Sequence, residues 1–301
     1  MLLVGTLALG LLTSACEWPG RDRAGGAVWP AASTEVHTFP SQASQTIPAS
    51  HAATPLAARI ATILQEAEGT YGIVVEHPAS GERVVHNPSR VFRSASVYKL
   101  AVACEVLRRV DAAQLGLDDP LVIEPEDAVE PEPAGGPGPG EAVSVRQAIN
   151  DMLTVSSNTA AHALLRQLDR SQFNAAIHTL GLRATRVPIE PDEAAVTTPA
   201  DMAHLLGLLA RAEILSDRSR RTLREWLALP KPLDPLVATL PPGTPVFAKP
   251  GELESASNVA GLIGTPTGTL TLAIFSEDVD PGDARATIGE IARAAYDSYS
   301  R

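Results

Sequence analysis

The chain has 301 residues, of which 45% are hydrophobic and 20% charged, and its formal net charge is −11. This balance is typical of a folded protein with one large or two modest domains, and it excludes an intrinsically disordered chain. The acidic charge, with no Lys/Arg-rich tract beyond the short segment 218–221, excludes nucleic acid as an expected partner.

Residues 1–16 have the features of a secretion signal. An apolar run without charge spans residues 1–12, and three small residues precede Cys16. The segment resembles a bacterial lipoprotein signal, whose cysteine becomes the lipidated first residue of the mature chain. It departs from that pattern because no Lys or Arg precedes the apolar run, and because Thr13 stands where Leu is usual. The run is too short for an ordinary transmembrane helix.

We therefore expect an exported protein. It is either tethered by a lipid at Cys16 to the outer side of the bacterial cytoplasmic membrane, or secreted or held by its signal segment. Residues 17–54 are rich in Pro, Ser, Thr, Ala and Gly, which predicts a flexible linker. A folded domain is expected over residues 55–301.

The folded domain is predicted to begin with a helix and a hairpin. Thr54 is the expected cap of the helix, with Pro55 in its first turn, and Gly69 ends it. Two short β-branched runs separated by a Pro-Ala-Ser-Gly turn then predict two antiparallel strands. The expected helix and strands span 55–64, 71–76 and 83–86.

The next predicted helix begins at Ser96 and ends near Gly116. Its apolar residues recur every three or four positions, and serine is favoured at a helix start. Ser96 and Lys99 are three residues apart, so both side chains lie on one face and can meet. A lysine whose pKa is lowered by desolvation can take the proton of a serine nucleophile. The simpler interpretation is a helix cap followed by a solvated lysine.

A Pro/Gly/Glu-rich loop at 124–141 is followed by helices and then by strands. The two cysteines do not predict a disulfide framework, and Cys104 is expected to be a small buried hydrophobe. The order predicts an α/β (α+β) fold: one antiparallel sheet built from both chain ends, flanked by helices, with an all-helical part inserted at about 96–230. The expected helices are 144–153, 159–168, 172–180, 198–209, 216–229 and 284–295, and the expected strands are 245–248, 257–263 and 269–275.

Three short motifs occur in order: Ser-Val-Tyr-Lys at 96–99, Ser-Ser-Asn at 156–158 and Lys-Pro-Gly at 249–251. Together they resemble the S-x-x-K, S-D-N and K-T-G motifs of class A β-lactamases and penicillin-binding proteins. The resemblance covers about residues 56–300, and includes the flanking segments 92–96, 155–161, 197–202 and 240–243. It implies the β-lactamase/transpeptidase-like fold and no cofactor.

The resemblance implies a role for each motif residue. Ser96 would be the acylated nucleophile and Lys99 its base. Ser156 would relay a proton to the leaving nitrogen, helped by Lys249, and Asn158 would hold the substrate amide.

The third motif would complete the oxyanion hole. The resemblance implies that the backbone N–H groups of Ser96 and Glu252, the residue after Gly251, stabilise the oxyanion.

The sequence also departs from the family pattern. The segment 186–197 is much shorter than the loop that carries the water-activating glutamate in class A enzymes. Glu190 is the first candidate for that carboxylate and Glu193 a weaker one, but no Leu-Asn follows, and a surface acidic loop is slightly favoured. Ser157 replaces an Asp, and Pro250 replaces a hydroxyl residue that would bind the substrate carboxylate.

Three functions remain open from the sequence. The first is an exported β-lactamase-like serine hydrolase acting on β-lactams or related amides. The second is a penicillin-binding or D-Ala-D-Ala-carboxypeptidase-like protein that deacylates slowly, with a peptidoglycan-type substrate. The third is a catalytically silent binding lipoprotein of the same fold. We expect a monomer, no metal, because the histidines lack zinc-ligand spacing, and no nucleic-acid partner.

Overall fold

The computed structural model describes residues 54–129, 132, 135–189, 193–228 and 234–300. The predicted signal segment with Cys16, the predicted linker and Glu190 lie outside the described residues. Among the described residues, no helix is both long and apolar enough to cross a bilayer.

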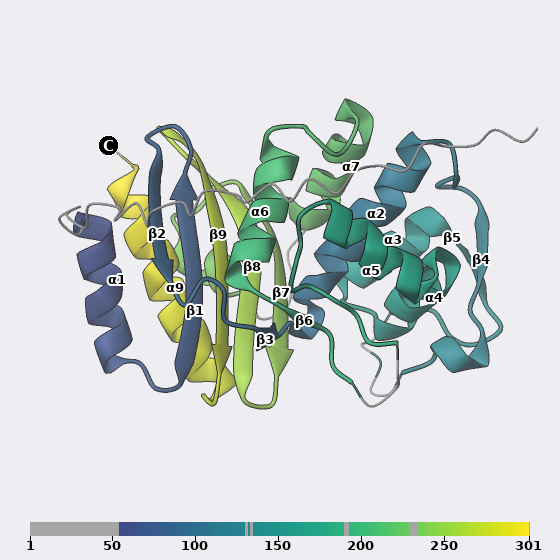
Figure 1. The fold of residues 1–301 in the computed structure, drawn as a ribbon, viewed down its shortest axis with the longest axis horizontal. Helices are drawn as coiled ribbons and strands as arrows, with labels where there is room; N and C mark the ends of the chain where they lie inside the picture. The colour runs from purple at the N-terminus through teal and green to yellow at the C-terminus, as the bar shows by residue number, and fades with distance from the viewer. Residues whose placement is uncertain (1–53, 130–131, 133–134, 190–192, 229–233, 301) are drawn as a thin grey trace, which may run out of the picture. The chain divides into compact units, whose positions relative to one another are not determined.

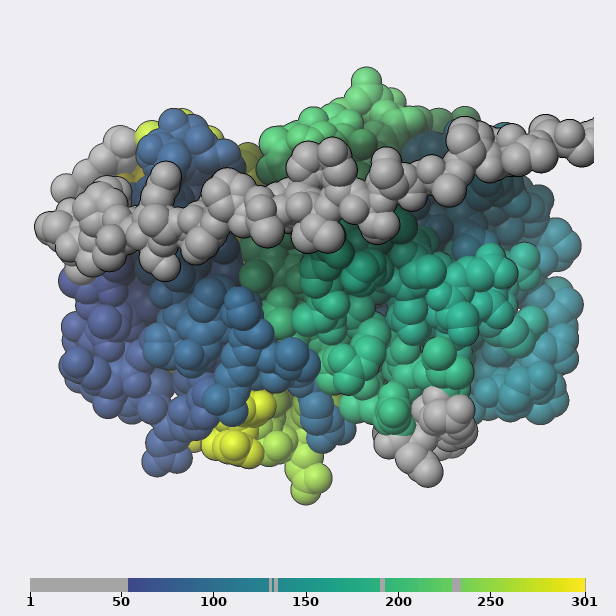
Figure 2. All heavy atoms as spheres, viewed as in Figure 1, coloured from purple at the N-terminus to yellow at the C-terminus, as the bar shows by residue number. Residues whose placement is uncertain are grey.

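A five-stranded antiparallel sheet is built from both ends of the described chain, as predicted (Figure 1). Its strand order is β2-β1-β9-β8-β7, so the N-terminal hairpin adds to the C-terminal meander through the β1–β9 pair. The space-filling view shows blue N-terminal and yellow C-terminal segments together, beside the teal segments from the middle of the chain (Figure 2). The strands are β1 Thr70–His77, β2 Glu82–His86, β7 Val246–Leu253, β8 Ala256–Thr265 and β9 Gly268–Glu277.

The central strands separate two hydrophobic cores because their side chains alternate between the two faces. In β1, Ile73 and Val75 pack in the core that contains α1 (Pro55–Glu66), α8 (Pro235–Thr239) and α9 (Pro281–Ser298). Val74, which lies between them, packs in the core of the helical part. The sheet is therefore covered on both faces: α1, α8 and α9 pack against one face, and the helical part packs against the other.

Helix α2 (Lys99–Asp111) lies at the centre of the helical part, and all its residues from Lys99 to Leu107 are buried. It begins later than predicted, because residues Ala95–Tyr98 form a 3-10 turn, η1, and Ser96 lies within this turn rather than capping a helix. It ends at Asp111, short of Gly116, because Ala113 adopts a left-handed conformation (φ 55°). The other helices here are α3 Val145–Thr154, α4 Asn158–Leu168, α5 Arg170–Thr179, α6 Pro199–Ala210 and α7 Asp217–Ala228.

Several short elements were not predicted. β3 (Phe92–Arg93) pairs with β6 (Val196–Thr197), and β4 (Pro120–Val122) pairs with β5 (Ala142–Ser144). Strands of two or three residues are too short to show a period, so tertiary pairing alone defines them. The short 3-10 turn η2 (Pro125–Asp127) and helix α8 were missed for the same reason.

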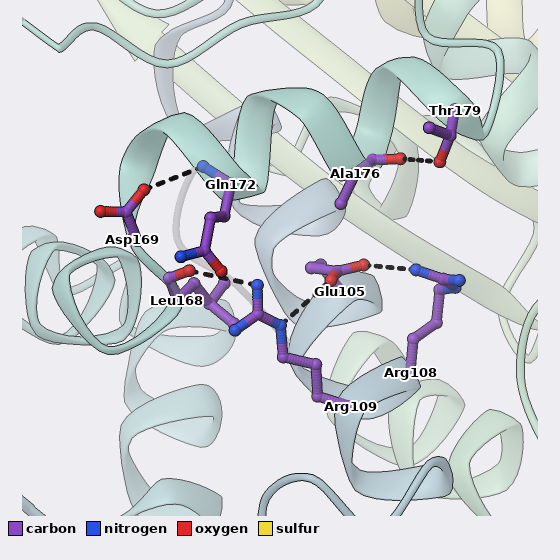
Figure 3. Close-up of polar contacts among 8 residues, drawn as sticks. All are labelled: Glu105, Arg108, Arg109, Leu168, Asp169, Gln172, Ala176 and Thr179. Carbon is purple, nitrogen blue, oxygen red and sulfur yellow. Dashed lines mark hydrogen bonds and ion pairs between the residues drawn. The ribbon is translucent and has the colours of Figure 1, made fainter. Parts of the chain in front are cut away.

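Buried Glu105 connects α2 to the junction of α4 and α5 (Figure 3). Its carboxylate accepts from Arg108 Nη1 at 2.6 Å and from Arg109 Nε at 3.2 Å. Arg109 also donates to the carbonyl oxygen of Leu168, the last residue of α4, at 3.1 Å. The next residue, Asp169, caps α5. This network therefore fixes α4 against the helix that follows Ser96.

Replacing Glu105 by glutamine should lower the free energy of unfolding by about 2 kcal/mol, because the two arginines lose a largely buried countercharge. Chemical denaturation monitored by circular dichroism measures the change. The matched control is Glu213→Gln, which removes the same charge from an exposed pair with Arg211 and should leave the unfolding midpoint at its wild-type value. Equal destabilisation by both substitutions would contradict this account of Glu105.

Candidate active site

The turn that carries Ser96 is held from both sides. Asn258 Nδ2, on β8, donates to the carbonyl oxygen of Arg93 at 3.0 Å. On the other side, the backbone N–H of Ser94 donates to the carbonyl oxygen of Ala195 at 2.8 Å. Ala95 then adopts a left-handed conformation (φ 48°), which costs a non-glycine residue of the order of 1–3 kcal/mol. The strained turn leaves Ser96 partly exposed at the head of buried α2.

Lys99 is fully buried, and its amine is surrounded by acceptors of the second motif. Lys99 Nζ donates to Ser156 O at 2.6 Å and to Asn158 Oδ1 at 2.7 Å, and lies 3.4 Å from Ser156 Oγ. Burial lowers its pKa from 10.5 to about 7, although the negative charge of Glu132 acts in the opposite direction. A neutral amine is therefore available near pH 7, as a general base requires.

Ser156 lies between two lysines. Lys249 Nζ, from strand β7, donates to Ser156 Oγ at 3.0 Å and to Pro250 O at 2.9 Å. Ser156 has a positive φ of 62°, the second left-handed residue of this site. Its hydroxyl therefore contacts one amine from α2 and one from the sheet, an arrangement suited to moving a proton.

Strand β7 packs directly against η1 at Gly251. A Cβ atom at this position would lie 2.6 Å from Ser96 N and 2.9 Å from Ala95 Cβ. The absence of a side chain thus lets the third motif reach the backbone of the first. Glu252 follows on the same strand, with its carboxylate paired to Arg285 at 2.6 Å.

The three motifs therefore converge. The structure brings together residues of η1, α2, α4, β7 and the connection before α4: Ser96, Lys99, Ser156, Asn158, Lys249 and Gly251. The sequence predicted that the Ser96 hydroxyl and the Lys99 amine could meet; among the described residues, the hydrogen bonds of this amine go instead to Ser156 and Asn158. Pro250 is accommodated because β7 is an edge strand, where a missing N–H is tolerated.

The short segment 186–197 is anchored beside the nucleophile turn. Arg186 and Val196 form a two-bond bridge at its base, with both N···O distances 3.0 Å. Asp201 holds the residues just before this bridge, because its Oδ2 accepts from Ala184 N and from Thr185 N and Oγ1, each at 2.8 Å. Glu193 is exposed near this base.

One residue of the site had no sequence signal. Glu132, from the Pro/Gly-rich loop, accepts from the backbone N–H groups of Asn158 and Thr159, both at 3.0 Å. It lies 26 residues before Asn158, and no motif relates the two. Among the described residues, no group of three or more His, Cys, Asp or Glu side chains is arranged to hold a metal ion.

Comparison with known proteins agrees with this geometry. A model of the β-lactamase enzyme family matches residues 55–299. An ancestral (GNCA) class A β-lactamase is 30% identical, with a TM-score of 0.74, covering 81% of this chain and 100% of that chain. A β-lactamase from Sphaerobacter thermophilus is 27% identical, with a TM-score of 0.72, covering 81% and 96%. PBP-A, at 22% identity, has a TM-score of 0.76, covers 82% and 96%, and shares the fold.

Proposed function

The chain belongs to the β-lactamase enzyme family, and from this premise we propose that it is a serine hydrolase acylated at Ser96 by β-lactams or related amides. The observation that carries the proposal is the position of the Ser156 hydroxyl between Lys99 and Lys249, beside the turn that presents Ser96. A serine needs a neighbouring base to act as a nucleophile, and the leaving nitrogen needs an acid.

The proposed reaction uses these groups in sequence. Ser96 Oγ attacks the amide carbonyl carbon while its proton passes to the neutral Lys99 amine. Backbone N–H groups of Ser96 and Glu252 would stabilise the oxyanion. The carbon–nitrogen bond then breaks as Ser156 gives its proton to the nitrogen and is reprotonated from a lysine ammonium group. The product is a Ser96 ester, which water hydrolyses to the free acid and serine.

Deacylation needs a base that activates water, and two carboxylates of the 186–197 segment are candidates. Glu190 is the first and Glu193 the second. The anchoring of this segment at Ala195, against Ser94, supports a contribution from it. Its shortness favours the second candidate function, a penicillin-binding protein with slow deacylation. Structures of this fold include a PBP-A mutant in an acyl-enzyme complex with penicillin G (24% identity, TM-score 0.75, 81% and 96% covered).

Nitrocefin turnover distinguishes the two functions. If the chain is a β-lactamase, wild-type protein should hydrolyse many equivalents of nitrocefin, and Glu190→Gln should slow deacylation roughly a hundredfold while leaving the first acylation unchanged. Glu193→Gln is measured beside it as the test of the second candidate, and the substitution that slows deacylation identifies the carboxylate that activates water. A burst of one equivalent without turnover would favour the penicillin-binding function. No reaction at all would favour the silent binding protein, for which Ser157 and Pro250 are the supporting residues.

A further inference from the structure

The first turn of α4 is held by a carboxylate from another part of the chain. Glu132 Oε2 accepts from Asn158 N and Thr159 N, both at 3.0 Å, and from Thr159 Oγ1 at 3.1 Å. Ser157 Oγ accepts from the next backbone N–H, that of Ala160, at 2.9 Å. The N-terminal N–H groups of a helix have no partner within it, and a negative charge at this end is stabilising. Glu132 therefore fixes the first turn of α4, which begins at Asn158.

The acceptors of Lys99 lie in the first residue of α4 and in the residue that precedes its N-cap. Asn158 Oδ1 and Ser156 O lie 2.7 and 2.6 Å from Lys99 Nζ. A shift of the first turn would move both acceptors away from the amine. The carboxylate of Glu132 also acts on Lys99 through its charge, which raises the pKa of the amine against the larger effect of burial. Position and charge at Lys99 thus both depend on Glu132.

The other ionisable groups around Lys99 leave this charge effect in place. Lys249 lies across Ser156 Oγ, to which both amines are directed. His162, one turn further along α4, has a pKa lowered to about 4, chiefly by burial, so it is neutral where Lys99 titrates. Glu132 is therefore the anionic neighbour that opposes burial at Lys99.

The loop and the second motif are matched to each other at this point. Ser157, fully buried, stands where the related motif has an aspartate. A Cβ atom at Gly136 would overlap Glu132 Oε1 and lie 2.9 Å from Ser157 Oγ. The glycine therefore makes room for the loop carboxylate next to the small serine. An aspartate charge absent from the motif is replaced by a glutamate charge from the loop.

The geometry points to Glu132 as a positioning residue of the acylation site, which holds the first turn of α4 against Lys99 and carries the negative charge that the second motif lacks. The inference rests on the proposed acylation of Ser96. It gives the 124–141 loop a role in that reaction through Lys99 and Asn158, without contact between Glu132 and the reacting atoms.

The first test reads the Lys99 amine directly and needs no activity. The chain has three lysines, Lys99, Lys231 and Lys249, so the side-chain signals of lysine labelled with ¹³C at Cε can be followed by NMR against pH. Loss of one signal in Lys99→Met assigns it. In Glu132→Gln, which keeps the shape and removes the charge, the Lys99 midpoint should fall by roughly one pH unit. Glu126→Gln, an exposed residue of the same loop, should leave it unchanged.

The second test is acylation by a fluorescent penicillin across the same pH range. In Glu132→Gln the acid limb should move down with the Lys99 midpoint. If this variant does not fold, Glu132→Asp keeps the charge and withdraws the carboxylate from the two N–H groups. It should acylate roughly tenfold more slowly, with the Lys99 midpoint at its wild-type value.

The outcomes separate the two proposals. An unmoved Lys99 midpoint in Glu132→Gln, or wild-type acylation by Glu132→Asp, would overturn the role of Glu132 while acylation of the wild type stands. A wild type that penicillin does not label would instead remove the acylation reaction, on which this role depends, and the NMR result would stand by itself as a property of Lys99.

Discussion

Replacing Lys99 by methionine should slow acylation of Ser96 by a penicillin roughly a thousandfold or more, within the range attributed to a positioned general base. Methionine is close to lysine in length and fits a fully buried position, but its thioether sulfur is not basic enough to take the Ser96 proton. Stopped-flow measurement with a fluorescent penicillin gives the rate constant. Leu100→Met is the matched control, because this neighbouring residue on α2 is equally buried and the exchange conserves volume.

The Lys99 amine also determines how acylation and the free energy of unfolding depend on pH. Burial lowers the pKa of Lys99 to about 7, so wild-type acylation should rise as pH increases through 7 and the amine loses its proton. The unfolded chain keeps that proton up to its ordinary value of 10.5, so the folded state binds fewer protons between pH 7 and 10.5. The free energy of unfolding should therefore increase with pH across this window, and less so in Lys99→Met. Acylation by Lys99→Met at the rate of Leu100→Met would contradict the assignment of Lys99 as base.

Replacing Gly251 by alanine should reduce acylation of Ser96 roughly a hundredfold, for a steric reason. The added methyl group would lie 2.6 Å from Ser96 N and 3.1 Å from Val97 N, so strand β7 and the nucleophile turn must separate. The distance between β7 and this turn should matter for the reaction, since a displacement of about 1 Å can cost roughly a hundredfold in rate. The loss would include the N–H group of Ser96, a proposed oxyanion donor.

Gly207→Ala is the control for this substitution. It lies within α6, where its new methyl group would meet only the flexible end of Arg211, and alanine is favourable in a helix. It should acylate at the wild-type rate. Acylation by Gly251→Ala within a few-fold of wild type, with the protein folded, would show that the contact between β7 and η1 is not needed for the reaction.

Much of the fold could be predicted because its elements are long and periodic. The five-stranded sheet, its origin in both chain ends and the cap at Thr54 are confirmed. The short pairs β3–β6 and β4–β5 could not be predicted, since tertiary contacts rather than local sequence define them. The same applies to the 3-10 turn at Ser96, which depends on the left-handed Ala95.

The residues of the site also differ in whether the sequence could predict them. Ser96, Lys99, Ser156, Asn158 and Lys249 could be named because each lies in a short motif with fixed order. Glu132 could not, because it belongs to a Pro/Gly-rich loop and approaches α4 only in three dimensions. The catalytic role of Glu190 and lipidation at Cys16 stay predictions, as both residues lie outside the described part of the chain.

Ser96 is the proposed nucleophile, served by the two lysines and Ser156, and mass spectrometry can identify the residue that penicillin acylates. After reaction with penicillin, quenching before the ester is hydrolysed, and digestion, we expect at most one penicillin per chain, attached to the peptide that contains Ser96. Ser96→Ala should carry none. An adduct on another residue, an equal adduct on Ser96→Ala, or a wild-type protein that shows neither an adduct nor turnover would contradict the assignment of Ser96 as the nucleophile.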